Sequence, residues 1–473
     1  MKCIVWFRKD LRLTDNPALQ EAVRLKAQII PIFILENSGP WQPGGASRWW
    51  LHHSLHQLNS ALNNSMHFYQ GDPLPILLEL IKQTQATAVV WNRRYGPEEI
   101  AVDTRIKTEL EARGIGVKSF NSHLLFEPWE IQNNQGKFFQ VFTPFWKKCL
   151  ARARIEPPLP IPANMQLMSG ATFDLKKLGL LPTKPDWASG LRQTWTPGEV
   201  GAQQKLANFI SRIAGYKQNR NYPAQQATSL LSPHLAWGEI SVRQLWHAIH
   251  TQIRLYPVLE QDALNFLSEI GWREFSYHLL YHVPTLPTHP LRQQFANFPW
   301  QQDENALRKW SQGQTGYPII DAGMRELWHT GYMHNRVRMI VASFLVKDLL
   351  LSWQQGEAWF WDTLVDADLA NNSASWQWVA GCGADAAPYF RVFNPVLQGE
   401  KFDPEGEYVK RWVPELDLLS ADYIHKPWQA SAIKLKGAGI ELGVTYPFPM
   451  VDHEKARHRA LEIYQELPRS TSS

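Results

Sequence analysis

The stretch Asp366-Ala-Asp-Leu-Ala-Asn-Asn-Ser-Ala-Ser-Trp-Gln-Trp378 carries most of the structural and functional information in this chain. If it is helical from Asp368 onward, Asp368, Asn372 and Trp376 share one face, while Trp378 points to nearly the opposite side. A core stripe is normally apolar, and burying Asp and Asn is costly unless something hydrogen-bonds them. The pattern therefore fits either an ordinary core helix or a helix that presents a different ligand on each face.

The residues that follow separate these two interpretations. They read Gly381-Cys-Gly-Ala-Asp-Ala-Ala-Pro-Tyr-Phe-Arg-Val-Phe-Asn-Pro395 and then Gln398-Gly-Glu-Lys-Phe-Asp403. This long run resembles the flavin-domain signature of the photolyase/cryptochrome family. With Trp376-Gln-Trp378 it is similar to the class I cyclobutane pyrimidine dimer photolyases in particular.

The composition is that of a globular protein without a global excess of charge. Its 473 residues suggest two or three domains, and a net charge of only +4 restricts any nucleic-acid site to a local patch. The cysteines Cys3, Cys149 and Cys382 show neither metal spacing nor an even disulfide set, which fits a reducing compartment. No apolar run reaches the ~18 residues needed to span a bilayer. We expect a cytoplasmic monomer without a membrane anchor or a metal site.

Residues 1–130 alternate strand and helix patterns. Asp15-Asn-Pro17 offers a helix cap followed by proline. The alternation predicts a Rossmann-like, mainly parallel sheet covered on both faces. The predicted strands are 3–7, 29–35, 66–70, 86–91 and 117–120.

The run Trp6-Phe-Arg-Lys-Asp-Leu-Arg-Leu-Thr-Asp-Asn-Pro17 is similar to the opening motif of the same family. That resemblance implies an antenna chromophore in this domain, either methenyltetrahydrofolate or a deazaflavin. Gly96 stands where many folate-binding relatives have an acidic residue, and Thr285-Leu-Pro-Thr-His289 lacks the Cys-Lys pair of some of them. The identity of the antenna stays open.

Periodicity fades over 131–200, where Pro157-Pro-Leu-Pro-Ile-Pro162 breaks any helix. We interpret this part as a long interdomain connector draped over the surface. Residues 201–473 are then predicted to form an all-helical domain, and the family resemblance implies that this domain binds FAD and DNA. Its predicted helices are 203–213, 241–253, 258–281, 304–312, 319–330, 335–350 and 370–379.

The first chemical signal in the helical domain is a cluster of hydroxyls ahead of a helix. Hydroxyls and backbone amides at a helix start can satisfy phosphate oxygens, although Ser and Thr are also ordinary helix caps. Resemblance to the FAD-phosphate segment of the family favours the first reading. The residues concerned are Tyr216, Thr228, Ser229, Leu230, Leu231 and Ser232.

Two further segments are expected to form the walls of a substrate pocket. On a helix, Glu269, Trp272 and Arg273 lie at i, i+3 and i+4 and can line one wall, although a surface ion pair beside a Trp would look the same. By resemblance, Glu269 hydrogen-bonds the damaged pyrimidine and Trp272 stacks on it. The other residues assigned to DNA or substrate are Asn335, Arg336, Met339 and Trp378.

The flavin ring is expected, again by resemblance, between Asp366, Ala367 and Asp368, with Asn372 near the reactive N5. A side-chain amide there can accept a hydrogen bond from a protonated N5 without adding negative charge. Arg338 is expected to pair with Asp366, because a buried charge needs a partner.

A tryptophan path for electrons, from Trp300 to Trp353 to Trp376 to FAD, is also implied by the resemblance. Spacing alone would not suggest it, because most of the 22 tryptophans must be core residues. The polar surroundings of Trp300 suggest that the path ends near solvent.

The sequence therefore predicts light-driven repair of cyclobutane pyrimidine dimers, with an electron passing from excited reduced FAD to a flipped-out dimer. A cryptochrome-type photoreceptor that signals through a protein partner is the alternative, and the few residues after Leu467 argue against it. Trp378 argues against a DASH-type relative, and Met339 against a (6-4) photolyase. A flavin oxidoreductase that works in darkness is a third possibility.

Overall fold

The computed structural model describes residues 1–37, 39–168, 174–389 and 391–468, which fold into two compact units. The first unit contains Met1–Tyr216, Ser229–Pro284 and Val365–Ala370. The second contains Lys217–Thr228, Thr285–Leu364 and Asn371–Ser473. The units divide the chain at other points than 130 and 200, because residues 229–284 belong to the same unit as the N-terminal sheet.

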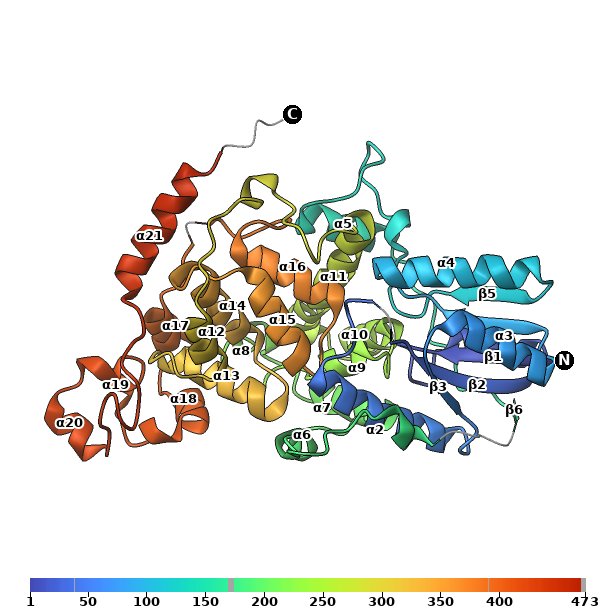
Figure 1. Cartoon of the computed structure of the whole chain (residues 1–473), viewed down its shortest axis with the longest axis horizontal. Helices are drawn as coiled ribbons and strands as arrows, with labels where there is room; N and C mark the ends of the chain where they lie inside the picture. The colour runs from blue at the N-terminus through green and yellow to red at the C-terminus, as the bar shows by residue number, and fades with distance from the viewer. Residues whose placement is uncertain (38, 169–173, 390, 469–473) are drawn as a thin grey trace. The chain divides into compact units, whose positions relative to one another are not determined.

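A parallel sheet forms the centre of the N-terminal part of the first unit (Figure 1). Its strand order is β3-β2-β1-β4-β5, with a short β6 that also pairs with β2. Every pairing is parallel, and Ile4 lies opposite Ile30 and Val89. This confirms the predicted Rossmann-like sheet. The strands are β1 (Lys2–Phe7), β2 (Gln28–Leu35), β3 (His67–Gln70), β4 (Ala88–Asn92), β5 (Gly116–Phe120) and β6 (Gln166–Leu167).

Helices cover the sheet because its strands are apolar on both sides. On one face, Trp6 and Trp91 pack with Leu77 of α3 and Ile106 of α4. The predicted cap of α1 is present, since the Asn16 side chain accepts from the Leu19 amide at 3.1 Å. The helices between the strands are α1 (Pro17–Arg24), α2 (Gly45–Ala61), α3 (Pro73–Thr84) and α4 (Pro97–Ala112).

The predicted connector contains more structure than its sequence suggests. Phe142, Phe145 and Trp146 are buried on α5, so this aromatic segment is a packed helix and not part of a surface strap. The remaining helices of the first unit are η1 (Pro128–Glu130), α5 (Phe142–Arg152), η2 (Leu175–Leu178), α6 (Ser189–Thr194), α7 (Glu199–Ile210), α9 (Ser232–Ala236), α10 (Val242–Leu255), η3 (Pro257–Leu259) and α11 (Glu260–His282).

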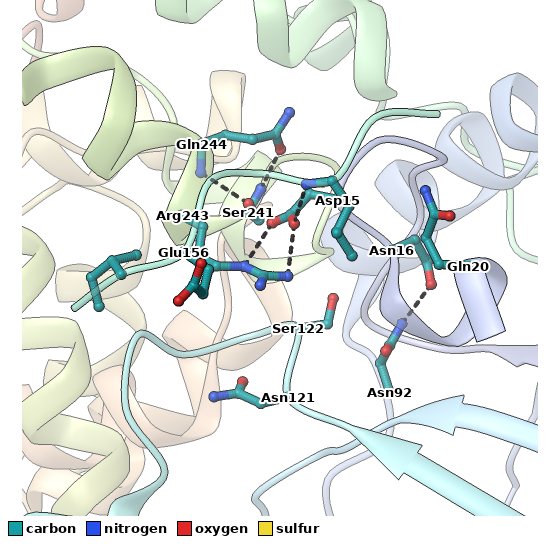
Figure 2. A network of polar contacts seen from close by, with 12 residues as sticks. Asp15, Asn16, Gln20, Asn92, Asn121, Ser122, Glu156, Ser241, Arg243 and Gln244 are labelled. Carbon is teal, nitrogen blue, oxygen red and sulfur yellow. Dashed lines mark hydrogen bonds and ion pairs between the residues drawn. The ribbon is translucent and has the colours of Figure 1, made fainter. Parts of the chain in front are cut away.

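The proline run of the connector is fixed to the sheet domain through Asp15, as Figure 2 shows for part of the network. The Asp15 amide donates to the Leu159 carbonyl at 2.8 Å, and the Leu159 amide donates to Asp15 Oδ1 at 3.0 Å. Arg243 of α10 donates from Nε to Asp15 Oδ2 at 3.1 Å and forms an ion pair with the same carboxylate, with Nη2 2.7 Å from Oδ1. One buried carboxylate therefore joins the sheet domain, the connector and α10.

The second unit is helical, as predicted, and ends in the long helix α21 (Figure 1). The helix predicted at 335–350 is divided into α14 and a π-helical turn, η5. None of the described helices is both long and apolar enough to cross a membrane. The helices are η4 (Gln293–Phe295), α12 (Glu304–Ser311), α13 (Pro318–Thr330), α14 (Asn335–Ser343), η5 (Phe344–Asp348), α15 (Trp353–Thr363), α17 (Pro395–Phe402), α18 (Glu407–Trp412), η6 (Pro414–Leu416), α19 (Ala421–Ile424), η7 (Pro427–Gln429), α20 (Ala432–Gly437) and α21 (His453–Glu466).

Two helices, α8 (Tyr216–Asn219) and α16 (Leu369–Ala380), run from one unit into the other. The helix α16 is the one predicted from the opening stretch, and it begins one residue earlier than expected.

Candidate functional site

The two carboxylates ahead of α16 are both buried and both hydrogen-bonded within the first unit. Ser232 Oγ donates to Asp366 Oδ2 at 2.6 Å, and the Tyr277 hydroxyl of α11 donates to Asp368 Oδ2. Such donors compensate the cost of burying a carboxylate. The loop that is expected to hold the flavin ring is thus fixed to α9 and α11.

The predicted phosphate segment has the backbone strain that often marks a binding site. Leu230 has φ of 55°, a left-handed conformation that is costly for a leucine. The next amide, of Leu231, donates to Ser229 Oγ at 3.3 Å. Tyr216 is buried against the rings of Phe209 and Phe266, and Thr228 belongs to the second unit.

Asn372 is positioned by a partner that the sequence did not reveal. Its Nδ2 donates to the backbone carbonyl of Glu357 at 3.0 Å, and the neighbouring Ser373 hydroxyl donates to the Glu357 carboxyl group. Burial raises the pKa of Glu357 to about 8, so this side chain is neutral at pH 7. Because the amide nitrogen of Asn372 is used in this contact, its side-chain oxygen is the group available to accept from a protonated flavin nitrogen.

Two of the three path tryptophans are buried and the third is partly exposed. Trp376 and Trp353 are 2% and 1% exposed, whereas Trp300 is partly exposed. Trp376 packs so closely on α15 that a Cβ on Gly356 would lie 2.1 Å from its ring. The Gln301 amide donates to the Leu350 carbonyl at 2.8 Å, which joins the Trp300 segment to the chain just ahead of Trp353.

The predicted substrate wall on α11 is partly exposed at two of its three positions. Glu269 and Trp272 are half-buried, and Trp272 stacks on Phe142 of α5 with ring centroids 3.9 Å apart. Arg273, in contrast, is buried and donates to the His123 backbone and ring. The ring of Trp272 is therefore supported from behind, which fits a stacking surface for a base.

The second wall, on α14, is basic and partly exposed. Arg336 Nη2 donates to Asn221 Oδ1 at 2.7 Å, and its guanidinium lies 4.4 Å from the Phe402 ring centroid. Asn335 is exposed and Met339 is half-buried on the same helix. Arg338 Nε donates to the Met333 carbonyl at 2.7 Å. These groups suit phosphate contact and DNA binding.

The two tryptophans of Trp376-Gln-Trp378 have different environments, as the helical pattern predicts: Trp376 is buried and Trp378 is half-buried. Between them, Gln377 is fully buried and donates to the carbonyls of Leu286 and His289 at 2.7 and 2.8 Å. Gln377 therefore fixes the 286–291 segment to α16.

Sequence reasoning missed several buried polar residues around the site. They are His123, Tyr277, Gln377, Glu357 and Glu274. Gln377 and Glu274 had a visible signal, because each lies in or directly beside a segment already singled out. The other three owe their positions to contacts distant in sequence.

As a set, the residues fit a flavin. Buried carboxylates with hydroxyl donors, a side-chain amide with an available oxygen and a buried tryptophan lie along one segment, 366–378. The first unit also offers the ring of Trp272, and the second unit offers the basic side chains of Arg336 and Arg338.

Comparisons with known proteins agree with this fit. Residues 3–163 match the family model described as DNA photolyase, and residues 266–466 match the FAD binding domain of DNA photolyase. The chain is 51% identical to a deoxyribodipyrimidine photo-lyase of Agrobacterium fabrum, covering 99% of this chain and 98% of that protein. It is 40% identical to Cryptochrome-1 of Arabidopsis thaliana, covering 98% of this chain and 70% of that protein.

Among solved structures, a bacterial class III photolyase from Agrobacterium tumefaciens superposes with a TM-score of 0.95 at 51% identity, covering 98% of this chain and 97% of that one. The class I assignment made from the sequence is therefore not supported. The level of identity and its extent show that this chain belongs to the photolyase/cryptochrome family.

Proposed function

We propose that this protein repairs cyclobutane pyrimidine dimers in DNA by light-driven electron transfer from reduced FAD, as a photolyase of class III. The observation that carries the proposal is that the first unit contains residues of two kinds. It holds both the half-buried Glu269 and Trp272 on α11 and the hydroxyl-bonded carboxylates of the flavin segment. The 51% identical deoxyribodipyrimidine photo-lyase supports the same activity.

In this proposal the flavin is held by the residues that the family resemblance assigns to it. Tyr216 and the segment Thr228–Ser232 bind its phosphates, Asp366, Ala367 and Asp368 border its ring, and Arg338 forms an ion pair with Asp366. Asn372 accepts from the flavin N5, which its contact with the Glu357 carbonyl supports. When bound and reduced, FAD supplies on excitation the electron that opens the cyclobutane ring.

The dimer enters as flipped-out bases, which is easiest where damage has already weakened stacking and pairing. Trp272 and Trp378 provide stacking surfaces, and the contact of Trp272 with Phe142 supports this role. Glu269 hydrogen-bonds the base edge. Asn335, Arg336 and Met339 contact the DNA beside the dimer, and charge-assisted contacts to phosphates fix its register.

The tryptophans Trp376, Trp353 and Trp300 form a path that reduces oxidised FAD in light. The increase in exposure towards Trp300 supports an exit there, because an oxidised indole can lose its proton to water at an exposed end. The path restores the active redox state and takes no part in dimer splitting.

The remaining features of the proposal concern the antenna chromophore, the domains, the compartment and the oligomeric state. An antenna chromophore, methenyltetrahydrofolate or a deazaflavin, binds in an antenna domain, 1–130, followed by a connector, 131–200, and a helical domain, 201–473. The protein acts as a cytoplasmic monomer.

The proposal is tested by releasing the bound chromophores and measuring binding to dimer-containing and intact oligonucleotides of one sequence. We expect released FAD and at least tenfold tighter binding to the damaged strand. A purified protein that binds FAD without preferring damaged DNA would favour the cryptochrome-type receptor instead.

A further inference from the structure

We infer that Arg273, His123 and Tyr277 form a buried hydrogen-bonded relay that fixes the Asp368 carboxylate, so that Arg273 acts on the flavin and not on DNA. The inference rests on the proposed function in one respect, namely that Asp368 borders the flavin ring. All four residues lie in the first unit and are buried.

The geometry of the relay centres on one ring nitrogen. His123 Nε2 lies 2.7 Å from Arg273 Nη2 and 2.7 Å from the Tyr277 hydroxyl. Arg273 Nη1 also donates to the His123 backbone carbonyl at 2.8 Å, and the Tyr277 hydroxyl donates to Asp368 Oδ2. Arg273 and Tyr277 are four residues apart on α11 and therefore face the same side.

Proton positions in the relay follow from donor chemistry. A guanidinium only donates, so His123 Nε2 must accept, and the imidazole is neutral with its proton on Nδ1. Burial, followed by the charge of Arg273, lowers the pKa of His123 well below its usual value, in agreement. Burial raises the pKa of Tyr277 well above its usual value, so the phenol keeps its proton.

The single proton of Tyr277 thus lies between two acceptors, His123 Nε2 and Asp368 Oδ2. Because Arg273 already donates to Nε2, the imidazole competes poorly and the proton goes to the carboxylate. If Arg273 no longer donates, Nε2 is able to accept a hydrogen bond from the Tyr277 hydroxyl and competes with Asp368 for this donor. Arg273 is in this way a positioning residue for Asp368.

The segment that carries His123 is itself held firmly. Glu274 Oε2 accepts from the amides of Leu125 and Phe126 at 2.9 and 3.2 Å, and the Asn121 side chain accepts from the His123 amide at 3.2 Å. The Tyr95 ring lies over the His123 ring at 6.4 Å. Rotation of the imidazole away from Tyr277 is therefore restricted.

The consequence concerns the redox potential of the flavin. A carboxylate beside the ring disfavours an added electron, and a donated hydrogen bond reduces that effect. Loss of the donor should make reduced FAD easier to oxidise. A direct DNA contact by Arg273, as the sequence alone suggested, would leave the potential unchanged.

The test measures the flavin midpoint potential in holoenzyme carrying Tyr277→Phe or Arg273→Lys. Lysine keeps the charge but cannot make both donations to His123. We expect each variant to favour oxidised over fully reduced FAD at least fivefold, a shift of about 20 mV to more negative potential at about 30 mV per tenfold for two electrons. Tyr281→Phe is the matched control, because its ring packs on Trp129 and His282 of the same unit.

Combining the two changes shows whether Arg273 acts through Tyr277. We expect Arg273→Lys to add no further shift in the Tyr277→Phe background, whereas equal shifts in both backgrounds would overturn the relay. If the Tyr277→Phe variant does not retain FAD, the Arg273→Lys variant alone tests the inference. An unchanged flavin midpoint potential together with weaker DNA binding in that variant refutes the inference. Failure of the parent protein to bind FAD is a separate result and refutes the proposed function.

Discussion

Replacing Glu357 by glutamine should change how the stability of the protein depends on pH. Glu357 is 1% exposed, and its carboxyl group accepts a hydrogen bond from the Ser373 hydroxyl. Glutamine has the same shape and can accept the same hydrogen bond. The backbone carbonyl of residue 357, which accepts the hydrogen bond from Asn372, is unaffected by the substitution.

The size of the effect follows from the pKa of Glu357, which burial raises from 4.5 to about 8. Between these values the unfolded chain releases the proton and the folded protein retains it, so folding stability falls as pH rises. With about 1.4 kcal/mol per pKa unit, the parent should lose about 2.5 kcal/mol from this group between pH 5 and pH 7. The Glu357→Gln variant should not show this loss of folding stability, because glutamine does not ionise.

The assay is urea unfolding of the FAD-loaded protein at pH 5, 6 and 7, followed by flavin and tryptophan fluorescence. We expect Glu357→Gln to gain stability relative to the parent by about 2.5 kcal/mol over this range. The exposed Glu405→Gln is the control and should follow the parent. Parallel curves for the parent and the Glu357 variant would show that the buried carboxyl group is already ionised, which would refute the reasoning.

Three further predictions concern substrate and electron transfer. Trp272→Ala should weaken binding to damaged DNA by ~1–3 kcal/mol with FAD retained, measured by titration, and unchanged discrimination against intact DNA would exclude this pocket. Glu269→Gln should lower the yield of dimer splitting more than the affinity for damaged DNA. If the Glu269 carboxyl group donates a hydrogen bond to the base, that bond strengthens as negative charge develops on the base. A loss of folding stability alone would indicate a structural role. Trp300→Phe should slow photoreduction of oxidised FAD but leave repair nearly intact once FAD is chemically reduced, and photoreduction at the parent rate would disprove this exit.

Periodic features of the fold were predictable from the sequence. The parallel sheet follows from apolar runs such as 3–7 and 29–35, and the cap at Asn16 follows from its position before Pro17. The aromatic run at 138–146 is aromatic enough to pack against a domain, but its local pattern did not predict the helix α5. Its burial depends on rings of α11, which local periodicity does not report.

In the candidate site, too, some residues were predictable from the sequence, whereas their partners were not. Asp368 could be singled out as a polar residue on a predicted helix face that should be apolar, and Asp366 by the family resemblance, although both lie just ahead of α16. Their partners Ser232 and Tyr277 lie 134 and 91 residues away in sequence, so no spacing rule could pair them. Arg273 was placed correctly on α11, but its burial against His123 depends on a loop 150 residues away.

The central claim, that light drives repair through reduced FAD, is tested most directly by following one dimer-containing oligonucleotide with the prereduced protein under blue light and in darkness. We predict restoration of intact pyrimidines only in light, with many dimers split per protein. Repair in darkness, or no repair in light with reduced FAD bound, would contradict the account.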